Sequence, residues 1–133
     1  MPREKSCGAV VFRENADREY LLLHYESGHW DFVKGNVEIS ESEKETVLRE
    51  LQEETGITRA EFIEDFREKI TYYYRRGGET IYKEVIFFLI KTKDPKVTLS
   101  YEHIGFKWLK YPEAVRKLTF ENAKKVLLKA HST

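Results

Sequence analysis

The sequence contains one cysteine, three prolines and no long hydrophobic run, and these shortages exclude several classes of protein. With Cys7 alone, the chain cannot form an internal disulfide framework, which favours a reducing compartment and predicts a cytoplasmic location. The longest apolar run covers residues 85–90 and is too short to span a bilayer, so no membrane partner is expected. No signal-peptide core follows the charged residues at 3–5, which also indicates a soluble protein.

Net charge is also absent, because 23 lysines and arginines balance 23 aspartates and glutamates. The chain therefore has no general attraction to nucleic acid or to an anionic membrane, and any functional charge must be local. Segments rich in serine, glycine or proline are missing, as are internal repeats, so nothing marks a linker. A length of 133 residues with 41% hydrophobic content predicts one domain over residues 1–133. The sequence gives no indication of the oligomeric state.

Strand patterns, which are short runs of β-branched and aromatic residues, occur in both halves of the chain. The first two runs are separated by a polar segment and predict a hairpin. A later pair of runs flanks Gly77-Gly78, which readily adopts the positive φ angles of a tight turn and predicts a second, longer hairpin. The predicted strands are 8–13, 19–25, 30–34, 61–74, 80–91 and 104–109.

Helix signals lie between and after these strands. Ser40 and Ser42 each precede a glutamate at capping-box spacing, and Gly56 suits the left-handed turn that ends a helix, which predicts a helix over 43–55. Two further helices are predicted, a short one beginning at Pro112 and a last one capped by Thr119 and ending near Ala130. This order of hairpins and helices predicts an α+β fold with a mixed β-sheet sandwiched between α-helices.

The helix predicted over 43–55 has an unusual concentration of carboxylates. At 100° per residue, Glu50, Glu53 and Glu54 fall within about a third of the helix circumference. A neighbouring arc suited to packing holds Val47, Leu48, Leu51 and Thr55. Clustered carboxylates repel one another unless they are solvated, paired with cations or bound to a metal, and hard oxygen ligands select Mg²⁺, Mn²⁺ or Ca²⁺.

Two residues near this helix fit a divalent-cation site. Arg49 is placed to pair with one carboxylate and hold it in position, and Gly35 permits close backbone approach, so that a main-chain carbonyl can join the coordination. The simpler alternative is that the acidic helix face is only solvated.

The wider pattern argues against that alternative. Gly35 is followed by five residues, Glu41, seven residues and then Arg-Glu-Leu-Gln-Glu-Glu-Thr-Gly-Ile at 49–57. The segment 35–57 resembles the Nudix box of the Nudix hydrolase family at every required position, and a pattern of this length is highly specific.

The resemblance implies a Nudix fold in which the box forms a loop–helix–loop over 35–57. It implies hydrolysis of nucleoside diphosphates linked to another moiety, with Mg²⁺ or Mn²⁺ held by Glu50, Glu53 and Glu54. Glu41 and Arg49 are expected to act in support. Glu50 is the box residue expected either to deprotonate the attacking water or to bind a second metal, and the sequence does not separate these roles.

Outside the box, nearly the whole chain resembles the asymmetrical diadenosine tetraphosphate (Ap4A) hydrolases of this family, which cleave Ap4A to ATP and AMP. Residues 29–35 resemble the subfamily's approach to the box, which implies that His29 and Lys34 contact the polyphosphate. The strand around Tyr72 resembles one whose tyrosine stacks on adenine, and Lys83 matches a phosphate-binding lysine. For an aromatic run of this kind, the alternative role is core packing.

Two further residues follow from the same resemblance. Residues 100–103, Ser-Tyr-Glu-His, resemble the subfamily's Ser-x-Glu-His stretch, which implies that Glu102 is another metal ligand or base. Phe120 lies near the place where the subfamily has an aromatic residue, so it is expected to form the second face of an adenine clamp or to anchor the last helix.

The chain departs from the subfamily in the loop that receives the polyphosphate. Val33 replaces a usual proline, Asn36 replaces a frequent histidine, and residues 39–40 replace a frequent Pro-Gly. The leading hypothesis is Mg²⁺-dependent cleavage of dinucleoside polyphosphates. The alternatives are pyrophosphate removal from RNA 5′ ends, hydrolysis of ADP-ribose or modified nucleoside triphosphates, and a catalytically silent nucleotide-binding regulator. Apart from an RNA 5′ end, nucleic acid is not expected as a partner.

Overall fold

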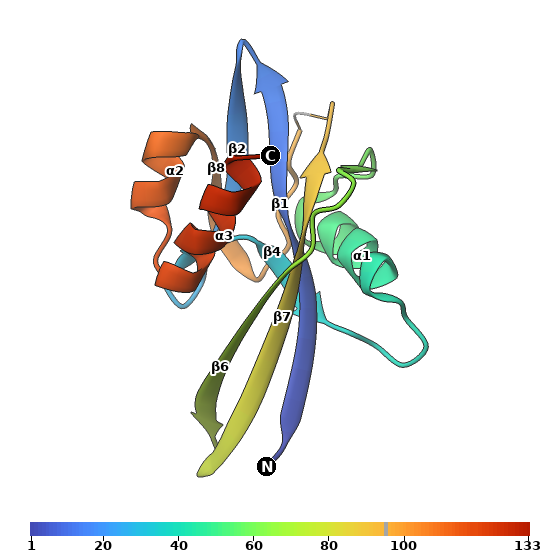
Figure 1. Ribbon diagram of the computed structural model, residues 1–133, viewed down its shortest axis with the longest axis vertical. Coiled ribbons are helices and arrows are strands. Elements are labelled where there is room, and N and C mark those ends of the chain that lie inside the picture. Colours follow the sequence, from blue (N-terminus) through green and yellow to red (C-terminus); the bar gives the residue numbers. More distant parts are fainter. Residues whose placement is uncertain (95) are drawn as a thin grey trace.

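The computed structural model describes residues 1–94 and 96–133 and places their strands in one eight-stranded sheet system (Figure 1). Its strands are β1 (Arg3–Asn15), β2 (Asp17–Tyr25), β3 (Trp30–Asp31), β4 (Val33–Asn36), β5 (Glu61–Phe62), β6 (Glu68–Arg76), β7 (Glu79–Lys91) and β8 (His103–Lys110). Its helices are α1 (Glu43–Thr55), α2 (Tyr111–Lys117) and α3 (Glu121–His131). None of the described helices has both the length and the apolar composition needed to cross a membrane.

Strand β1 is the centre of the sheet. It pairs antiparallel with β2 and β4 and parallel with β7, and β7 in turn pairs antiparallel with β5 and β6. Strand β2 also pairs antiparallel with β3 and β8, which lie on opposite edges of it because Leu23 and His24 pair with both. The sheet is therefore mixed, because one parallel pair lies among antiparallel ones, as the sequence predicts.

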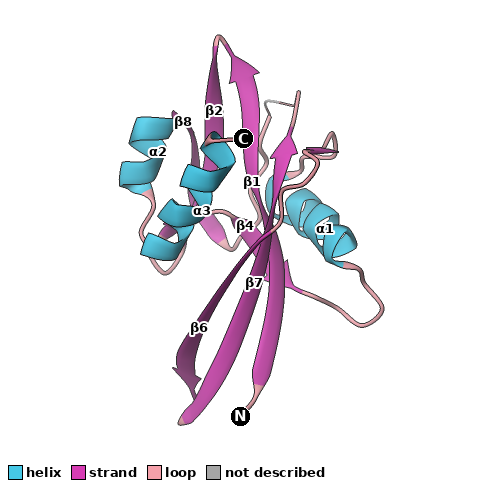
Figure 2. Ribbon diagram, in the orientation of Figure 1, coloured by secondary structure: helices cyan, strands magenta, loops and turns pink. Residues whose placement is uncertain are grey.

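Helices cover both faces of this sheet, with α1 on one face and α2 and α3 on the other (Figure 2). Because successive strand residues point to opposite faces, β1 contributes to two cores. Val10 packs in the cluster that includes Leu127 of α3, whereas Val11 packs in the cluster that includes Leu51 of α1. These layers confirm the predicted sandwich of a mixed sheet between α-helices.

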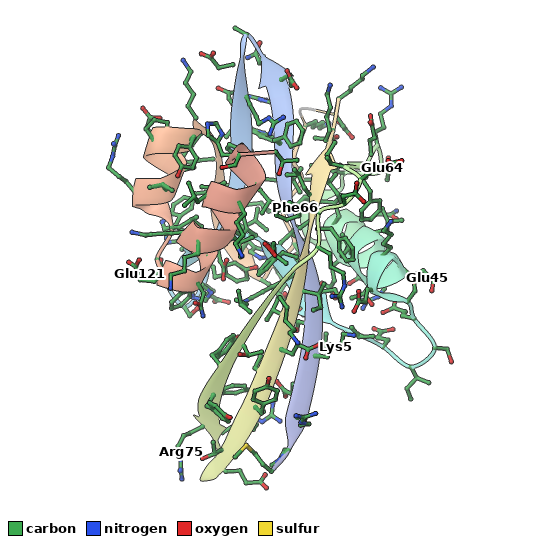
Figure 3. The ribbon with its side chains drawn as sticks, in the orientation of Figure 1. Lys5, Glu45, Glu64, Phe66, Arg75 and Glu121 are labelled. Carbon is green, nitrogen blue, oxygen red and sulfur yellow. The ribbon has the colours of Figure 1, made fainter. Side chains whose placement is uncertain are left out.

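Part of the sheet extends beyond the helices. The first half of β1 and the hairpin of β6 and β7 form this extension, with Lys5 and Arg75 labelled along it in Figure 3. Along β6, Tyr72 and Tyr74 are half-buried on one face while Tyr73 is 63% exposed on the other. The alternation follows from the two-residue period of a strand.

Helix α1 begins and ends at the predicted residues. Of the two candidate caps, Ser42 is the N-cap, and it forms a complete capping box with Glu45. Ser40 instead has a positive φ of 68° in the preceding loop. Gly56 ends the helix with a φ of 75°. The local signals therefore fix the orientation of the carboxylate-bearing helix along the chain.

Three local predictions are wrong. The strand predicted over 61–74 is divided into β5 and β6, because Asp65 has a φ of 64° and interrupts the extended backbone. The N-cap of α3 is Phe120, and Thr119 Oγ1 instead accepts a hydrogen bond from the Trp30 backbone at 2.8 Å. Leu48, expected on the packing arc of α1, is 42% exposed.

Candidate active site

Glu50, Glu53 and Glu54 of α1 face a cleft of about 550 Å³. Three segments meet there: the C-terminal half of α1, the end of β4 with the loop that follows it, and the loop before β8. The lining residues are Lys34, Gly35, Asn36, Glu38, Glu50, Glu53, Glu54, Ser100, Tyr101 and Glu102. The structure thus brings the predicted box carboxylates and Glu102 to one cleft.

The Glu50 side chain lies so close to the backbone of Gly35 that a larger residue does not fit there. A Cβ atom built at Gly35 would lie 2.0 Å from Glu50 Cδ and 2.1 Å from Glu50 Oε1, far inside contact distance. Any side chain at this position therefore displaces the carboxylate. The close approach expected at Gly35 is made by the Glu50 side chain, and coordination by a main-chain carbonyl there stays a prediction.

Arg49 holds several acidic groups together. Its Nε donates to Glu41 Oε2 at 2.6 Å, and its Nη1 donates to Glu50 Oε1 at 2.7 Å and to Glu53 Oε2 at 3.3 Å. Its Nη2 also donates to the Asn36 carbonyl at 2.9 Å. The prediction that Arg49 pairs with one carboxylate is therefore too narrow, because a planar guanidinium has enough donors for several.

Glu41 supports this arrangement from the loop before α1. Hydrogen bonds from Arg49, from the backbone of Glu38 and from the Thr46 hydroxyl lower the pKa of Glu41 to about 2. Glu41 is therefore ionised at neutral pH. Glu41 lies behind Arg49, away from the lining of the cleft, and its supporting role stays a prediction.

Glu54 is the buried member of the group, with 3% of the residue exposed. Neither carboxylate oxygen has a hydrogen-bond partner among the described residues. His103 Nε2 lies 3.1 Å from Glu54 Oε1, but its orientation does not satisfy hydrogen-bond geometry. Burial, reinforced by Glu50 and Glu102, raises the pKa of Glu54 well above its usual range.

The residues at this cleft fit a divalent cation. The orphaned oxygens of Glu54 are acceptors that need a partner, and Gly35 leaves room beside Glu50. Within residues 1–94 and 96–133, no three acidic, histidine or cysteine side chains already converge on a single metal position. Carboxylate oxygens are hard donors that suit a divalent cation bound together with water and substrate phosphates.

A second cavity of about 370 Å³ adjoins the acidic cleft and shares Lys34 with it. Tyr72 of β6 and Phe120, at the start of α3, both line this cavity, together with Ile70 and Ala123. The predicted aromatic pair is therefore brought together across 47 residues of chain. The lining is mostly apolar, as is typical of a site for a flat organic group.

His29 and Lys34 lie beside these two cavities. The His29 ring lies 5.3 Å from the Phe120 ring and stacks at 4.5 Å on Tyr25. Burial lowers the pKa of His29, so this side chain is uncharged at neutral pH. Lys34 Nζ lies 3.2 Å from Asp31 Oδ2, a partner that a phosphate can replace.

Lys83 lies outside the acidic cleft and contacts it through Asn36. Its Nζ donates to Asn36 Oδ1 at 2.9 Å and to Glu4 Oε1 at 3.3 Å, and it lines neither cavity. Lys83 is opposite Tyr72 in the pairing of β6 and β7, so it lies between the aromatic cavity and the acidic cleft. Burial lowers the pKa of Lys83, although Glu4 opposes the effect.

Asn36 and the contact of His103 with Glu54 were not predicted from the sequence. His103 is distant in the chain from α1, and only folding places the two side chains together. The signal available for Asn36 was its place directly after Gly35, where it replaces a frequent histidine.

Comparisons with known proteins agree with this geometry. The family model described as NUDIX domain matches residues 2–130. The chain is 37% identical to the rat (Rattus norvegicus) bis(5′-nucleosyl)-tetraphosphatase [asymmetrical] over 96% of this chain and 92% of the relative. The Caenorhabditis elegans protein of the same name is 36% identical, over 84% of this chain and 83% of that protein.

Solved structures give the same result. The crystal structure of a C. elegans Ap4A hydrolase binary complex superposes with a TM-score of 0.86 and 31% sequence identity, covering 97% of this chain and 96% of that one. The box motif, the sandwich fold and these matches over nearly the whole chain lead to one conclusion. This chain belongs to the Nudix family.

Proposed function

We propose that this chain is an asymmetrical bis(5′-nucleosyl)-tetraphosphatase that hydrolyses Ap4A to ATP and AMP. The observation that carries the proposal is the junction of the acidic cleft with the aromatic cavity at Lys34. A dinucleoside polyphosphate has one part suited to each: a flat apolar base and a chain of anionic phosphates. The names and the coverage of the rat and C. elegans relatives support the same substrate.

In this proposal the base lies between Tyr72 and Phe120. Both side chains line the aromatic cavity, and stacking between two rings suits a purine face. The phosphates then pass Lys34 into the acidic cleft, with His29 and Lys83 at its sides. Cationic and hydrogen-bonding groups along this path offset the charge of the polyphosphate.

The box glutamates, Glu50, Glu53 and Glu54, are proposed to hold Mg²⁺ or Mn²⁺, with the Gly35 backbone nearby. When bound, the metal neutralises phosphate oxygens and lowers the pKa of a water molecule.

In this proposal the protein's side chains transfer the proton and position the carboxylates. Glu50, packed against Gly35, is placed to accept the proton of the attacking water or to act as a ligand. Glu102 faces the same cleft and is the second candidate for either role. Arg49 keeps Glu50 and Glu53 pointing into the cleft, and Glu41 fixes Arg49 from behind.

Product analysis by chromatography tests the proposal. The protein is incubated with Mg²⁺ or Mn²⁺ and separately with Ap4A, ADP-ribose, 8-oxo-dGTP and 5′-triphosphorylated RNA. We expect ATP and AMP from Ap4A at the highest kcat/KM, reduced at least about 100-fold in Glu53→Gln because a carboxylate ligand is lost. Faster turnover of another compound would overturn the substrate, and inactivity on all four would overturn the enzymatic proposal.

A further inference from the structure

Asn36 lies at the end of β4, where the chain leaves the sheet and enters the loop before α1. It is exposed and lines the acidic cleft directly after Gly35. Its backbone carbonyl accepts a hydrogen bond from Arg49 Nη2 at 2.9 Å. The main chain of Asn36 is therefore bound to the carboxylate network, while its side-chain amide makes separate contacts.

The side-chain amide of Asn36 has a defined orientation. Its Oδ1 accepts from Ser6 Oγ at 2.8 Å and from Lys83 Nζ at 2.9 Å. An ammonium group only donates, so the atom facing Lys83 must be the amide oxygen. The amide nitrogen and its two hydrogens are then directed away from Lys83 and remain available to an acceptor.

Strand pairing places the partners of this amide. Ser6 is opposite Asn36 in the antiparallel pair of β1 and β4, and Glu4 is opposite Lys83 in the parallel pair of β1 and β7. Glu4 also accepts hydrogen bonds from Arg76 and Tyr74, so its charge is shared among several donors. Lys83 is thus held from two sides, by a neutral amide and by a partly neutralised carboxylate.

We propose that Asn36 is a specificity-determining residue for the polyphosphate, with its carbonyl oxygen orienting Lys83 and its NH₂ group donating to a phosphate oxygen. The inference rests on the proposed function, because it places the phosphates in the acidic cleft. An amide suits this position because it is both acceptor and donor and is uncharged.

Asn36→Asp tests the donor with little change in shape. The aspartate keeps acceptors for Ser6 and Lys83 but replaces the NH₂ donor with a negatively charged oxygen. We expect KM for Ap4A to rise at least tenfold, about 1.4 kcal/mol, with kcat within about twofold of wild type. Asn15→Asp in the β1–β2 turn adds the same charge far from the cleft and should leave both constants unchanged. Equal KM values in the two variants would overturn the proposal.

Ser6→Ala tests the orientation of the amide. The serine is buried and its hydroxyl donates to Asn36, so the variant loosens the amide without touching the substrate. We expect KM to rise about threefold while the melting temperature changes little. An unchanged KM, or a loss of kcat that follows a loss of stability, would overturn the orienting role.

Binding of inorganic tripolyphosphate, followed by calorimetry with Mg²⁺ present for every variant, separates this inference from the proposed function. We expect Asn36→Asp to weaken the Kd of tripolyphosphate at least tenfold relative to Asn15→Asp. If the wild type prefers another phosphorylated substrate but Asn36→Asp still loses affinity, only the proposed substrate is overturned. If Ap4A is hydrolysed and Asn36→Asp binds tripolyphosphate as tightly as wild type, only the role of Asn36 is overturned.

Discussion

Arg49 illustrates how single residues determine the geometry of the site. One planar guanidinium contacts Glu41, Glu50 and Glu53 together with the carbonyl of Asn36. A lysine has one compact charged group and cannot reproduce this fork of donors. The sequence motif predicted that Arg49 supports the carboxylates. The number of its partners depends on the path of the segment before α1, which brings Glu41 and the Asn36 carbonyl to Arg49.

Gly35→Ala is the sharpest prediction at the residue scale. The new Cβ would overlap the end of the flexible Glu50 side chain, so the carboxylate moves while the backbone stays in place. We expect kcat/KM for Ap4A to fall about 100-fold, because a misplacement of about 1 Å is costly in catalysis. The melting temperature should change by less than about 3 °C, because few core contacts are disturbed.

Gly105→Ala is the matched control. A Cβ at this β8 position would meet only His24 Cβ, at 3.7 Å, which is an ordinary contact. The variant should retain wild-type kcat/KM. Equal activities of the two alanine variants would show that Gly35 does not act through Glu50.

At the scale of elements, α1 is attached to the sheet by charge as well as by its packing face. Glu43, in the first turn of the helix, accepts two hydrogen bonds at 2.8 Å from Arg67, and Lys5 Nζ lies 2.7 Å from its Oε2. The Arg67 guanidinium, followed by Lys5, lowers the pKa of Glu43 to about 2. The helix that carries the box is thereby tied to β1 and to the segment before β6.

Glu43→Gln should therefore destabilise the protein in a pH-dependent way. A carboxyl whose pKa is lowered from 4.5 to about 2 on folding stabilises the protein above pH 4.5 and loses this contribution as the pH falls towards 2. We expect a loss of about 1 kcal/mol at pH 7, allowing for solvent screening of the partly exposed pair. Urea unfolding of wild type and variant measures the difference at pH 7 and pH 3.

The contrast between the two pH values is the decisive feature. If the ion pairs stabilise the fold, the difference in the free energy of unfolding between variant and wild type is smaller at pH 3 than at pH 7. A difference in the free energy of unfolding that is the same at pH 7 and pH 3 would mean that Glu43 acts through packing and not through charge.

At the scale of the whole molecule, the site costs stability. Folding buries Glu54 beside Glu50, with no hydrogen bond for either Glu54 oxygen among the described residues. Burial of an uncompensated carboxylate is unfavourable, and the two hydrophobic cores of the sandwich must offset it. A ligand that binds only the folded state stabilises it and so offsets part of this unfavourable free energy.

Glu54→Gln should make the metal-free protein more stable and inactive. The substitution removes the free-energy cost of burying this carboxyl or of protonating it on folding, so we expect a gain of about 1 kcal/mol at pH 8, or roughly 3 °C in melting temperature. Mg²⁺ should raise the melting temperature of wild type more than that of the variant, because a ligand is lost. Thermal unfolding with EDTA and with Mg²⁺ measures both effects.

The exposed Glu121→Gln variant is the control for the loss of one negative charge. It should respond to Mg²⁺ as wild type does, because its carboxylate lies outside the acidic cleft. If Glu54→Gln gains the same stabilisation from Mg²⁺ as wild type, Glu54 is not a ligand.

The sequence by itself determined the chemistry and most of the elements. The box at 35–57 contains the carboxylates, their arginine, the capping serine and the terminating glycine within one short segment, and local spacing is sufficient to predict a helix with an acidic face. The alternation of the tyrosines along β6 is also a local property, because it follows from the two-residue period of a strand. One local prediction failed because Asp65 adopts a rarer backbone conformation, whereas those at Thr119 and Leu48 failed through tertiary contacts and exposure.

Only the tertiary structure decided which distant residues meet. The pairing of β1 with both β4 and β7 brings Asn36 to Lys83, and the docking of α3 closes a cavity between Phe120 and Tyr72. The burial of Glu54 beside His103 likewise depends on the loop before β8. These contacts arise from strand register and helix packing over long separations, which no local pattern of residues specifies.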